Sequence, residues 1–173
     1  MAERELWDRI RRQDAGAFDV LYRAYGVGLH SFLKQLLGNA HAAEDVAQEV
    51  FTSIWQHPNG FDPDRGSLRA YVFGAARKHA ADWWRNQKPQ SGSPPEKPEK
   101  CRAETQILLA DAFAKLPPEQ RSLLWLREVE GQSYAELAAI LEIPEGTVRS
   151  RLFAARKALK QVWHATRHHK ETS

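Results

Sequence analysis

A proline-rich segment in the middle of this chain of 173 residues divides it into two parts. Residues 86–103, NQKPQSGSPPEKPEKCRA, contain four prolines, two serines and a glycine but no large apolar residue. A segment that cannot bury apolar surface is typical of a flexible or extended tether. Both flanks show apolar residues at helical spacing, and neither shows the alternation of a strand. We therefore predict an all-α protein with two small helical domains, residues 1–87 and 104–173, joined by a flexible linker at 88–103.

Charge and cysteine content narrow the possible classes of protein. The net charge of +3 is too small to identify a nucleic-acid binder, but seven Lys or Arg residues and one acid lie between Arg149 and Ser173. The single cysteine, Cys101, cannot form an internal disulfide and has no cysteine partner for a structural zinc site. No stretch approaches the ~20 apolar residues of a membrane span. We expect a cytoplasmic protein without membrane insertion, metal or cofactor.

The C-terminal part contains two short helical patterns joined by a tight turn. Pro144 and Gly146 mark the turn, because proline lacks an N–H donor and glycine relaxes the backbone. The first pattern has its apolar residues at i, i+3, i+4 and i+7, and the second repeats a similar spacing. These apolar positions are Tyr134, Leu137, Ala138 and Leu141 in the first helix, and Val148, Leu152, Ala155 and Leu159 in the second. The arrangement predicts a helix-turn-helix.

The second of these helices also carries cations beside its apolar stripe. Arg149, Phe153 and Arg156 recur at i, i+4 and i+7, with Ser150 and Lys157 next to them. A helix-turn-helix places its second helix in the major groove of DNA, where arginines bind phosphates and base edges. An Arg/Lys-rich face can also be a solvated face without a ligand, so the pattern by itself leaves both interpretations open.

The N-terminal part predicts four helices. They run from about Arg4 to Ile10, from about Ala15 to Leu37, from Ala42 to His57, and from Ser67 to about Arg85, with a possible restart of the second after Gly26 and Gly28. Gly38-Asn39 ends the second helix, and Ser67 is a plausible N-cap of the fourth. The tail after Trp163 is polar and is expected to fray.

The third and fourth of these helices each have a polar face that is either functional or merely solvated. Asp45, Gln48, Glu49 and Thr52 share one net acidic face of the third helix. The fourth helix interleaves basic residues with aromatics, a combination that suits single-stranded nucleic acid because phosphates pair with cations while bases stack on rings. Tryptophans in a small helical domain are more often core residues, and we expect at least one of Trp83 and Trp84 to be buried.

Three stretches of this chain resemble a known family. AEDVAQEVFTSIWQH (residues 43–57) and FDPDRGSLRAYVFGAARKHAADWWR (61–85) are similar to region two of bacterial sigma-70-type factors. LPPEQRSLLWLREVEGQSYAELAAILEIPEGTVRSRLFAARKAL (116–159) is similar to region four. Two regions joined directly by a short linker resemble the extracytoplasmic-function (ECF) group. The resemblance covers nearly the whole chain except the linker and the tail.

The resemblance implies a function for each surface. The chain would bind the clamp helices of the largest subunits of core RNA polymerase, hold the melted strand of the −10 promoter element, and read the −35 element as duplex. The residues implied for polymerase binding are Asp45, Gln48, Glu49, Phe51 and Thr52. Those implied for −10 binding are Asn59, Phe61, Asp62, Arg65, Ser67, Arg69, Arg77, Lys78 and Arg85. Those implied for −35 binding are Thr147, Arg149, Ser150, Arg151, Phe153, Arg156 and Lys157, of which Arg151 and Lys157 fit phosphates better than bases.

The same resemblance implies a regulatory partner, and two positions of this chain depart from the usual pattern of the family. ECF factors are commonly held inactive by an anti-sigma factor, here a helical partner wedged between the domains or wrapped around them. Tyr71 stands where a tryptophan is common, and Ala154 stands where many members have a basic residue, so the promoter sequence recognised is open.

Two alternatives come from other classes of protein. A helix-turn-helix repressor or activator that binds duplex DNA as a dimer would explain residues 134–159 but would leave the N-terminal helices without a role. A helical enzyme is disfavoured because the chain shows no metal-ligand spacing, no phosphate-binding glycine loop and no nucleophile with a neighbouring base. We expect no catalytic residues.

Overall fold

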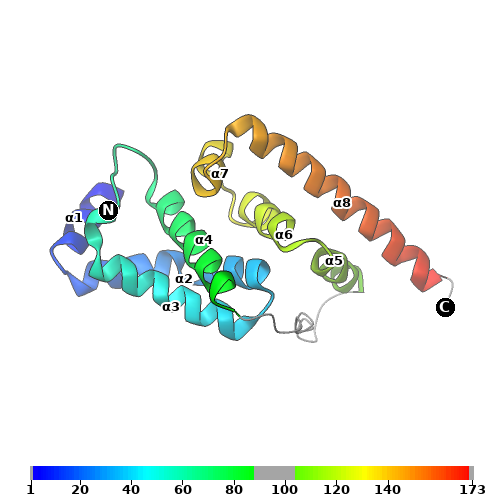
Figure 1. The fold of residues 1–173 in the computed structure, drawn as a ribbon, viewed down its shortest axis with the longest axis horizontal. Coiled ribbons are helices and arrows are strands. Elements are labelled where there is room, and N and C mark those ends of the chain that lie inside the picture. The colour runs from blue at the N-terminus through cyan, green and yellow to red at the C-terminus, as the bar shows by residue number, and fades with distance from the viewer. Residues whose placement is uncertain (1, 88–103, 172–173) are drawn as a thin grey trace.

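The computed structural model describes residues 2–87 and 104–171, and within these ranges it contains helices and turns but no strand (Figure 1). The N-terminal half consists of α1 (Glu3–Arg11), α2 (Ala15–Leu37), α3 (Ala40–Gln56), a short 3₁₀ turn η1 (Pro58–Gly60) and α4 (Leu68–Asn86). The C-terminal half consists of α5 (Glu104–Ala114), α6 (Pro118–Leu124), a π-helical turn η2 (Trp125–Val129), α7 (Tyr134–Leu141) and α8 (Glu145–Glu171). The predicted linker at 88–103, with Cys101, lies outside the described residues, as do the side chains of His168 and His169.

Polar side chains cap the starts of three helices in the N-terminal half, and the cap at Ser67 was predicted. Asp14 accepts from the backbone N–H groups of Gly16 and Ala17 at the start of α2. Asn39 caps α3 and Ser67 caps α4 in the same way, because the first N–H groups of a helix have no partner within it. Gly38 ends α2 with φ of 68°, a conformation that glycine adopts without a steric penalty. The four predicted helices are confirmed, and α2 continues through Gly26 and Gly28 without a restart.

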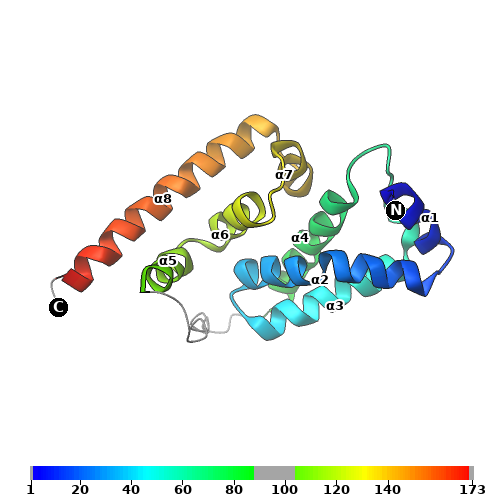
Figure 2. The ribbon, with the colours of Figure 1, turned by 180° about the vertical axis from the view of Figure 1, so that it is seen from behind.

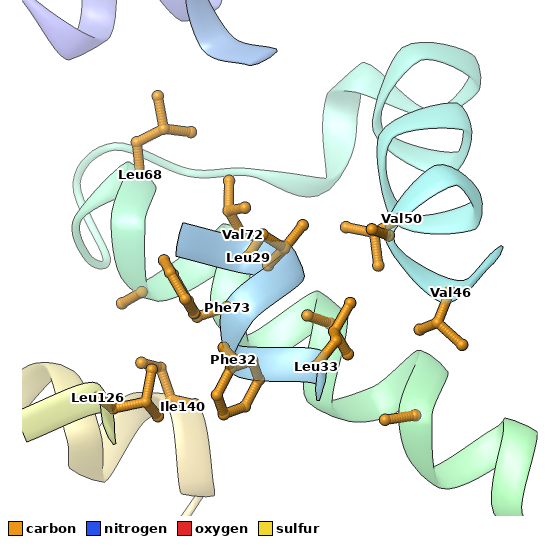
Figure 3. Packing of buried hydrophobic residues seen from close by; sticks show 14 of the residues in the cluster. Leu29, Phe32, Leu33, Val46, Val50, Leu68, Val72, Phe73, Leu126 and Ile140 are labelled. Atoms are coloured by element: carbon orange, nitrogen blue, oxygen red, sulfur yellow. The ribbon is translucent and has the colours of Figure 1, made fainter. Parts of the chain in front are cut away.

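The two halves pack against each other through one continuous apolar core. In Figure 3, Phe32 of α2 and Phe73 of α4 lie toward Leu126 of η2 and Ile140 of α7. All four side chains are almost completely buried, and the rings of Phe32 and Phe73 meet edge to face at 5.6 Å. The helices in contact across this boundary are α4 with α7 and α2 with α6, as seen from opposite sides in Figures 1 and 2. Apolar burial of this kind is the dominant favourable term in helix packing.

A buried arginine adds directional contacts to this boundary. Nε of Arg121 in α6 donates to the backbone carbonyl of Gln35 in α2 at 3.2 Å, and Nη1 donates to the carbonyl of Ala114 at 2.7 Å. Burial lowers the pKa of Arg121. The charged side chain therefore joins α6 to the end of α2 and to the end of α5 by hydrogen bonds that specify how these elements meet.

Two details of the C-terminal half differ from the sequence-based expectation. Gly146 lies in the first turn of α8, because the connection from α7 is complete at Pro144. The tail after Trp163 does not fray, since α8 continues to Glu171. Val162 and Thr166 are half-buried on the side of α8 that packs along α5, and Lys115, directly after α5, donates to the Thr166 hydroxyl at 3.4 Å. This packing supports three helical turns beyond the helix-turn-helix.

Candidate nucleic-acid interface

Helix α8 presents an exposed basic and aromatic face. Val148, Leu152 and Ala155 are buried on its inner side, while Arg149, Phe153 and Arg156 lie on the outer side. The ring of Phe153 is 71% exposed. Of the other residues predicted here, Ser150, Arg151 and Lys157 are exposed and Thr147 is half-buried. The predicted face is therefore brought together on one helix and is open to solvent.

The π-helical turn η2 supports the arginines of this face. Glu128 of η2 accepts from Arg156 through Nε at 3.1 Å and Nη2 at 2.6 Å. The ring of Tyr134 faces the guanidinium groups of Arg127 at 4.8 Å and Arg149 at 5.3 Å, within the range of cation–π attraction. Sequence reasoning missed Glu128 and Arg127, because residues so far from the recognition helix along the chain give no periodic signal.

The acidic face of α3 is also exposed, with one exception. Asp45, Gln48, Glu49 and Thr52 are all open to solvent along one side of the helix. Phe51 is only 5% exposed, and its ring packs on Tyr22 at 4.9 Å and on Phe18 at 6.2 Å. Phe51 therefore lies beneath this face rather than on it, because an aromatic ring gains more from burial than from solvent.

The loop before α4 divides into exposed and buried residues in a similar way. Asn59, Asp62 and Arg65 are exposed, and Asp62 Oδ1 accepts from the backbone N–H of Asp64 at 3.0 Å. Phe61 is 3% exposed, and it packs against the rings of Trp7 at 5.0 Å and Tyr71 at 5.3 Å. This aromatic cluster anchors the loop to α1 and α4.

Helix α4 uses several of its predicted nucleic-acid-binding residues in contacts with the C-terminal half. The Ser67 hydroxyl donates to Glu136 Oε1 at 2.9 Å, and Arg69 Nη1 donates to the backbone carbonyl of Glu130 at 2.7 Å. Lys78 and Glu142 form an ion pair at 3.0 Å. These three contacts, which we call the α4–α7 latch, leave the three side chains of α4 already engaged.

The last turns of α4 carry the remaining predicted residues. Arg77 is half-buried, and Arg85 is exposed and forms an ion pair with Asp82 in the same helix. Trp83 is half-buried and Trp84 is 50% exposed, with their rings edge to face at 5.2 Å. Neither ring is fully buried, contrary to the expectation: Trp83 packs partly buried against the core, whereas Trp84 is exposed.

The sequence contains a signal for the start of α7, the helix on one side of the latch. Ser133 and Glu136 have the S-x-x-E spacing of a capping box, in which each side chain bonds to the backbone of the other. The structure contains this box at the start of α7. Oε1 of Glu136 is left over to accept from Ser67. The box could have located the start of α7, although not its partner on α4.

Comparison with known proteins assigns the chain to a family. Residues 21–90 match the model of sigma-70 region 2, and residues 106–159 match that of sigma-70 region 4. The chain is 34% identical over 157 residues to the ECF RNA polymerase sigma factor SigL of Mycobacterium tuberculosis, covering 85% of this chain and 89% of that protein. The chain belongs to the ECF group of sigma factors. It is a transcription initiation factor, which binds core RNA polymerase and recognises promoter DNA, and the region 2 match gives the N-terminal helices the role that a simple repressor would lack.

Solved sigma factor structures support the fold. The structure of CnrH in complex with the cytosolic domain of CnrY matches with a TM-score of 0.73 and 25% identity, covering 95% of this chain and 99% of that chain. The sigma factor RpoE of Bartonella quintana, solved in complex with the anti-sigma factor NepR, matches with a TM-score of 0.71 and 23% identity over 84% of this chain and 95% of that chain. The expected all-α fold with two helical domains is confirmed.

In this sigma factor a groove lies between the two halves. Its volume is about 620 Å³, and its lining comes from α2, α4, α6, α7 and α8. Phe32, Leu36, Leu123 and Leu141 provide apolar surface, and Arg77, Lys78 and Arg151 provide positive charge. Trp84 lines the same groove. The groove therefore combines an apolar lining with cations and lies beside the latch.

No helix in residues 2–87 and 104–171 is both long enough and apolar enough to span a bilayer.

Proposed function

We propose that the three exposed surfaces divide the work of promoter recognition in this sigma factor. The face of α3 with Asp45, Gln48, Glu49 and Thr52 binds the clamp helices of the largest polymerase subunits, supported from below by Phe51. The loop at 59–67 and helix α4 hold the melted strand of the −10 element. Helix α8 reads the −35 element in the major groove. The corresponding domains are residues 1–87 and 104–173, with the linker at 88–103.

The exposure of Phe153 is the observation that carries this proposal. A phenylalanine that is 71% exposed between Arg149 and Arg156 forgoes the ~1.5–3 kcal/mol that burial of such a side chain provides. The adjoining side of α8 is fully packed, so the exposure does not come from a loose helix. In a major groove the ring contacts the methyl group of thymine while the arginines bind guanine or phosphate.

The packed arrangement of the two halves fits the factor when it is not bound to polymerase. Ser67, Arg69 and Lys78 of α4 are engaged by the latch, whereas the outer face of α8 is exposed. Separated promoter elements require the two domains to move apart, so polymerase binding has to break the latch. In the closed arrangement the latch occupies Ser67, Arg69 and Lys78 of the −10 surface, and duplex binding through α8 remains sterically possible.

An anti-sigma factor that stabilises the closed arrangement is the partner that the groove fits. An amphipathic helix with apolar residues on one side and acids along its edges would fit this groove. Its apolar side would complement Leu36, Leu141 and Trp84, and its acids would complement the charges of Arg77 and Arg151. The similar protein CnrH was solved with the cytosolic domain of CnrY. Such a helix would contact both halves at once and would therefore favour the closed state.

The proposed role involves no chemistry by the protein itself, so the factor acts as a binding protein rather than as an enzyme. It works in the cytoplasm, where core polymerase and promoter DNA are found. The residues proposed for each surface act through phosphate contacts, base edges and protein–protein packing.

Run-off transcription with bacterial core polymerase on a promoter library tests the proposal. New start sites are expected only when this protein is present, and they should disappear with Asp45→Ala and with Arg149→Ala. Asp111→Ala on α5 and Arg12→Ala after α1 are matched controls, since both residues are exposed and lie outside the proposed surfaces. If core polymerase gains no start site with the wild-type protein, the assignment of these surfaces fails.

The partner is tested in the same assay. A cognate anti-sigma domain should abolish the start sites, and Leu36→Glu should restore them by placing a carboxylate against the apolar side of the inhibitor helix. Inhibition that is equal for the wild type and for Leu36→Glu would place the inhibitor elsewhere.

A further inference from the structure

The exposed face of α8 continues well beyond the residues proposed to read the −35 element. Lys160, His164 and Arg167 follow Arg156 at i+4, i+8 and i+11, and all three are exposed. With Arg149 and Phe153 they form one stripe at helical spacing along a single side of the helix. Nothing in the region 4 match covers this segment, since that match ends at residue 159.

The two cations at the C-terminal end of this stripe, Lys160 and Arg167, have no carboxylate partner among the described residues. Helix α8 has an acid at Glu145 and at Glu171 and none between them. Lys160 and Arg167 form no ion pair with any residue in the part of the chain that the structure describes, whereas Arg149 and Arg156 each have a carboxylate nearby. A solvated face of an ordinary helix usually mixes both signs of charge, so a run of cations without acids indicates an anionic partner.

The orientation of this segment is set by its packing. Val162 and Thr166 are half-buried on the side that faces α5, and Thr166 contacts Lys115. Lys160, His164 and Arg167 are therefore held on the same side as the recognition residues, and Figure 1 shows α8 continuing as one helix along α6 and α5.

Helix α8 is longer than the major groove of DNA is wide. The segment from Arg149 to Arg156 is about 10 Å long, comparable to the groove width of about 12 Å. Arg167 lies about 16 Å farther along the axis at a rise of 1.5 Å per residue. A helix lying in the groove through its first three turns therefore extends past the phosphate ridge that borders the groove, and its long cationic side chains lie within reach of that ridge.

We propose that Lys160, His164 and Arg167 form a second DNA-binding site on α8. This site binds the phosphates of duplex DNA that flank the −35 element. The proposal rests on the proposed role of α8 in reading that element. Lys160 and Arg167 supply charge, and the imidazole of His164 adds an N–H donor. Duplex DNA is favoured over an acidic protein surface because the stripe is continuous with the DNA-reading face and has no exposed apolar anchor of its own.

Binding of the full-length protein to labelled duplexes of two lengths tests this site. One duplex contains only the −35 element identified by run-off transcription, and the other is extended on either side by about one helical turn of DNA. Affinities are measured as a function of salt concentration. The extension should raise wild-type affinity severalfold, and Lys160→Ala/Arg167→Ala should remove that gain and lower the magnitude of the salt slope by about 2.

Two further variants separate a binding role from a structural one. Lys160→Arg/Arg167→Lys should restore both the gain and the slope, because phosphate binding requires charge rather than a particular cation. Arg12→Ala/Arg23→Ala removes the same number of charges from exposed positions outside α8 and should leave the length dependence unchanged.

The outcomes are distinct. If Lys160→Ala/Arg167→Ala keeps the wild-type length dependence and salt slope, the second site is refuted while −35 binding stands. A loss of affinity for the polymerase complex with unchanged duplex binding would identify a protein partner and also overturn the proposal. If the wild-type protein does not discriminate the −35 duplex from random duplex, the proposed function of α8 fails first.

Discussion

The hydroxyl of Ser67 at the start of α4 donates a hydrogen bond of 2.9 Å to Oε1 of Glu136 in the first turn of α7. Each residue also has a local task, since Ser67 caps α4 and Glu136 completes the capping box of α7 with Ser133. Two helix starts from opposite halves of the sigma factor therefore share one hydrogen-bond network. Substitutions at Glu136 should therefore affect both the stability of α7 and the packing of the two halves against each other.

The stability of the closed protein should depend on the ionisation of Glu136. Burial by itself raises the pKa of Glu136, but hydrogen bonds from the Ser133 backbone and from the Ser67 and Ser133 hydroxyls, with the charge of Arg69, lower the pKa overall from its ordinary 4.5. A carboxylate with a depressed pKa in the folded state contributes stability above its unfolded pKa and loses that contribution as the pH falls through the folded value. Denaturant unfolding between pH 7 and about pH 3 should show a smaller acid-dependent loss for Glu136→Gln. The control is Asp111→Asn, and an unchanged pH profile for Glu136→Gln would contradict the prediction.

Loosening the latch should expose the −10 surface without altering any residue proposed to touch DNA. Glu136→Gln/Glu142→Gln weakens the acceptors of Ser67 and Lys78 while both of these side chains stay in place. We expect the double variant to bind a single-stranded −10 oligonucleotide several times more tightly than the wild type in the absence of polymerase. Fluorescence anisotropy measures this, with −35 duplex affinity as the internal control. Equal single-strand affinity of the two proteins would show that the latch does not cover the −10 surface.

Glu128 should compete with DNA for Arg156. Its carboxylate holds the guanidinium through two hydrogen bonds to Oε1, and both side chains are partly exposed. Exposed ion pairs are worth about 0–1 kcal/mol, so Glu128→Gln should raise affinity for duplex DNA by up to about fivefold. The same titrations on specific and random duplexes will show whether discrimination falls as affinity rises. A loss of affinity would mean instead that Glu128 orients Arg156 for base contact.

Gln132 is a buried polar residue that should be replaceable with a gain in stability. Its side chain is completely buried, and neither Nε2 nor Oε1 has a hydrogen-bond partner among the described residues. An unsatisfied buried polar group costs about 1–3 kcal/mol. Gln132→Met keeps a similar length and removes the polar atoms, so we expect the free energy of unfolding to rise by about 1 kcal/mol. The midpoint of chemical denaturation measures the change, and a decrease would indicate that the amide has a partner in solution.

Local patterns in the sequence were sufficient to predict the helices and much of the candidate site. The caps Asn39 and Ser67 act within three residues of themselves, and the apolar stripe of α8 at Val148, Leu152 and Ala155 follows from helical periodicity. Periodicity assigns a residue to a side of a helix but does not measure how far an aromatic ring is withdrawn from solvent. Phe51 packs against Tyr22, and Phe61 packs against Trp7 and Tyr71, so both of these implied binding residues are buried in the structure.

The sequence by itself determined that this protein is an all-α sigma factor of the ECF group, with acidic, mixed and basic faces on α3, α4 and α8. These properties depend on residue types at short spacings, which local hydrogen bonding and periodicity convert directly into helices and faces. Only the tertiary structure decided that α4 packs on α7, that Ser67, Arg69 and Lys78 are engaged there, and that α8 continues as a helix to Glu171. Such contacts join residues about 60 or more positions apart. They depend on the shape and charge of surfaces that exist only after each half has folded.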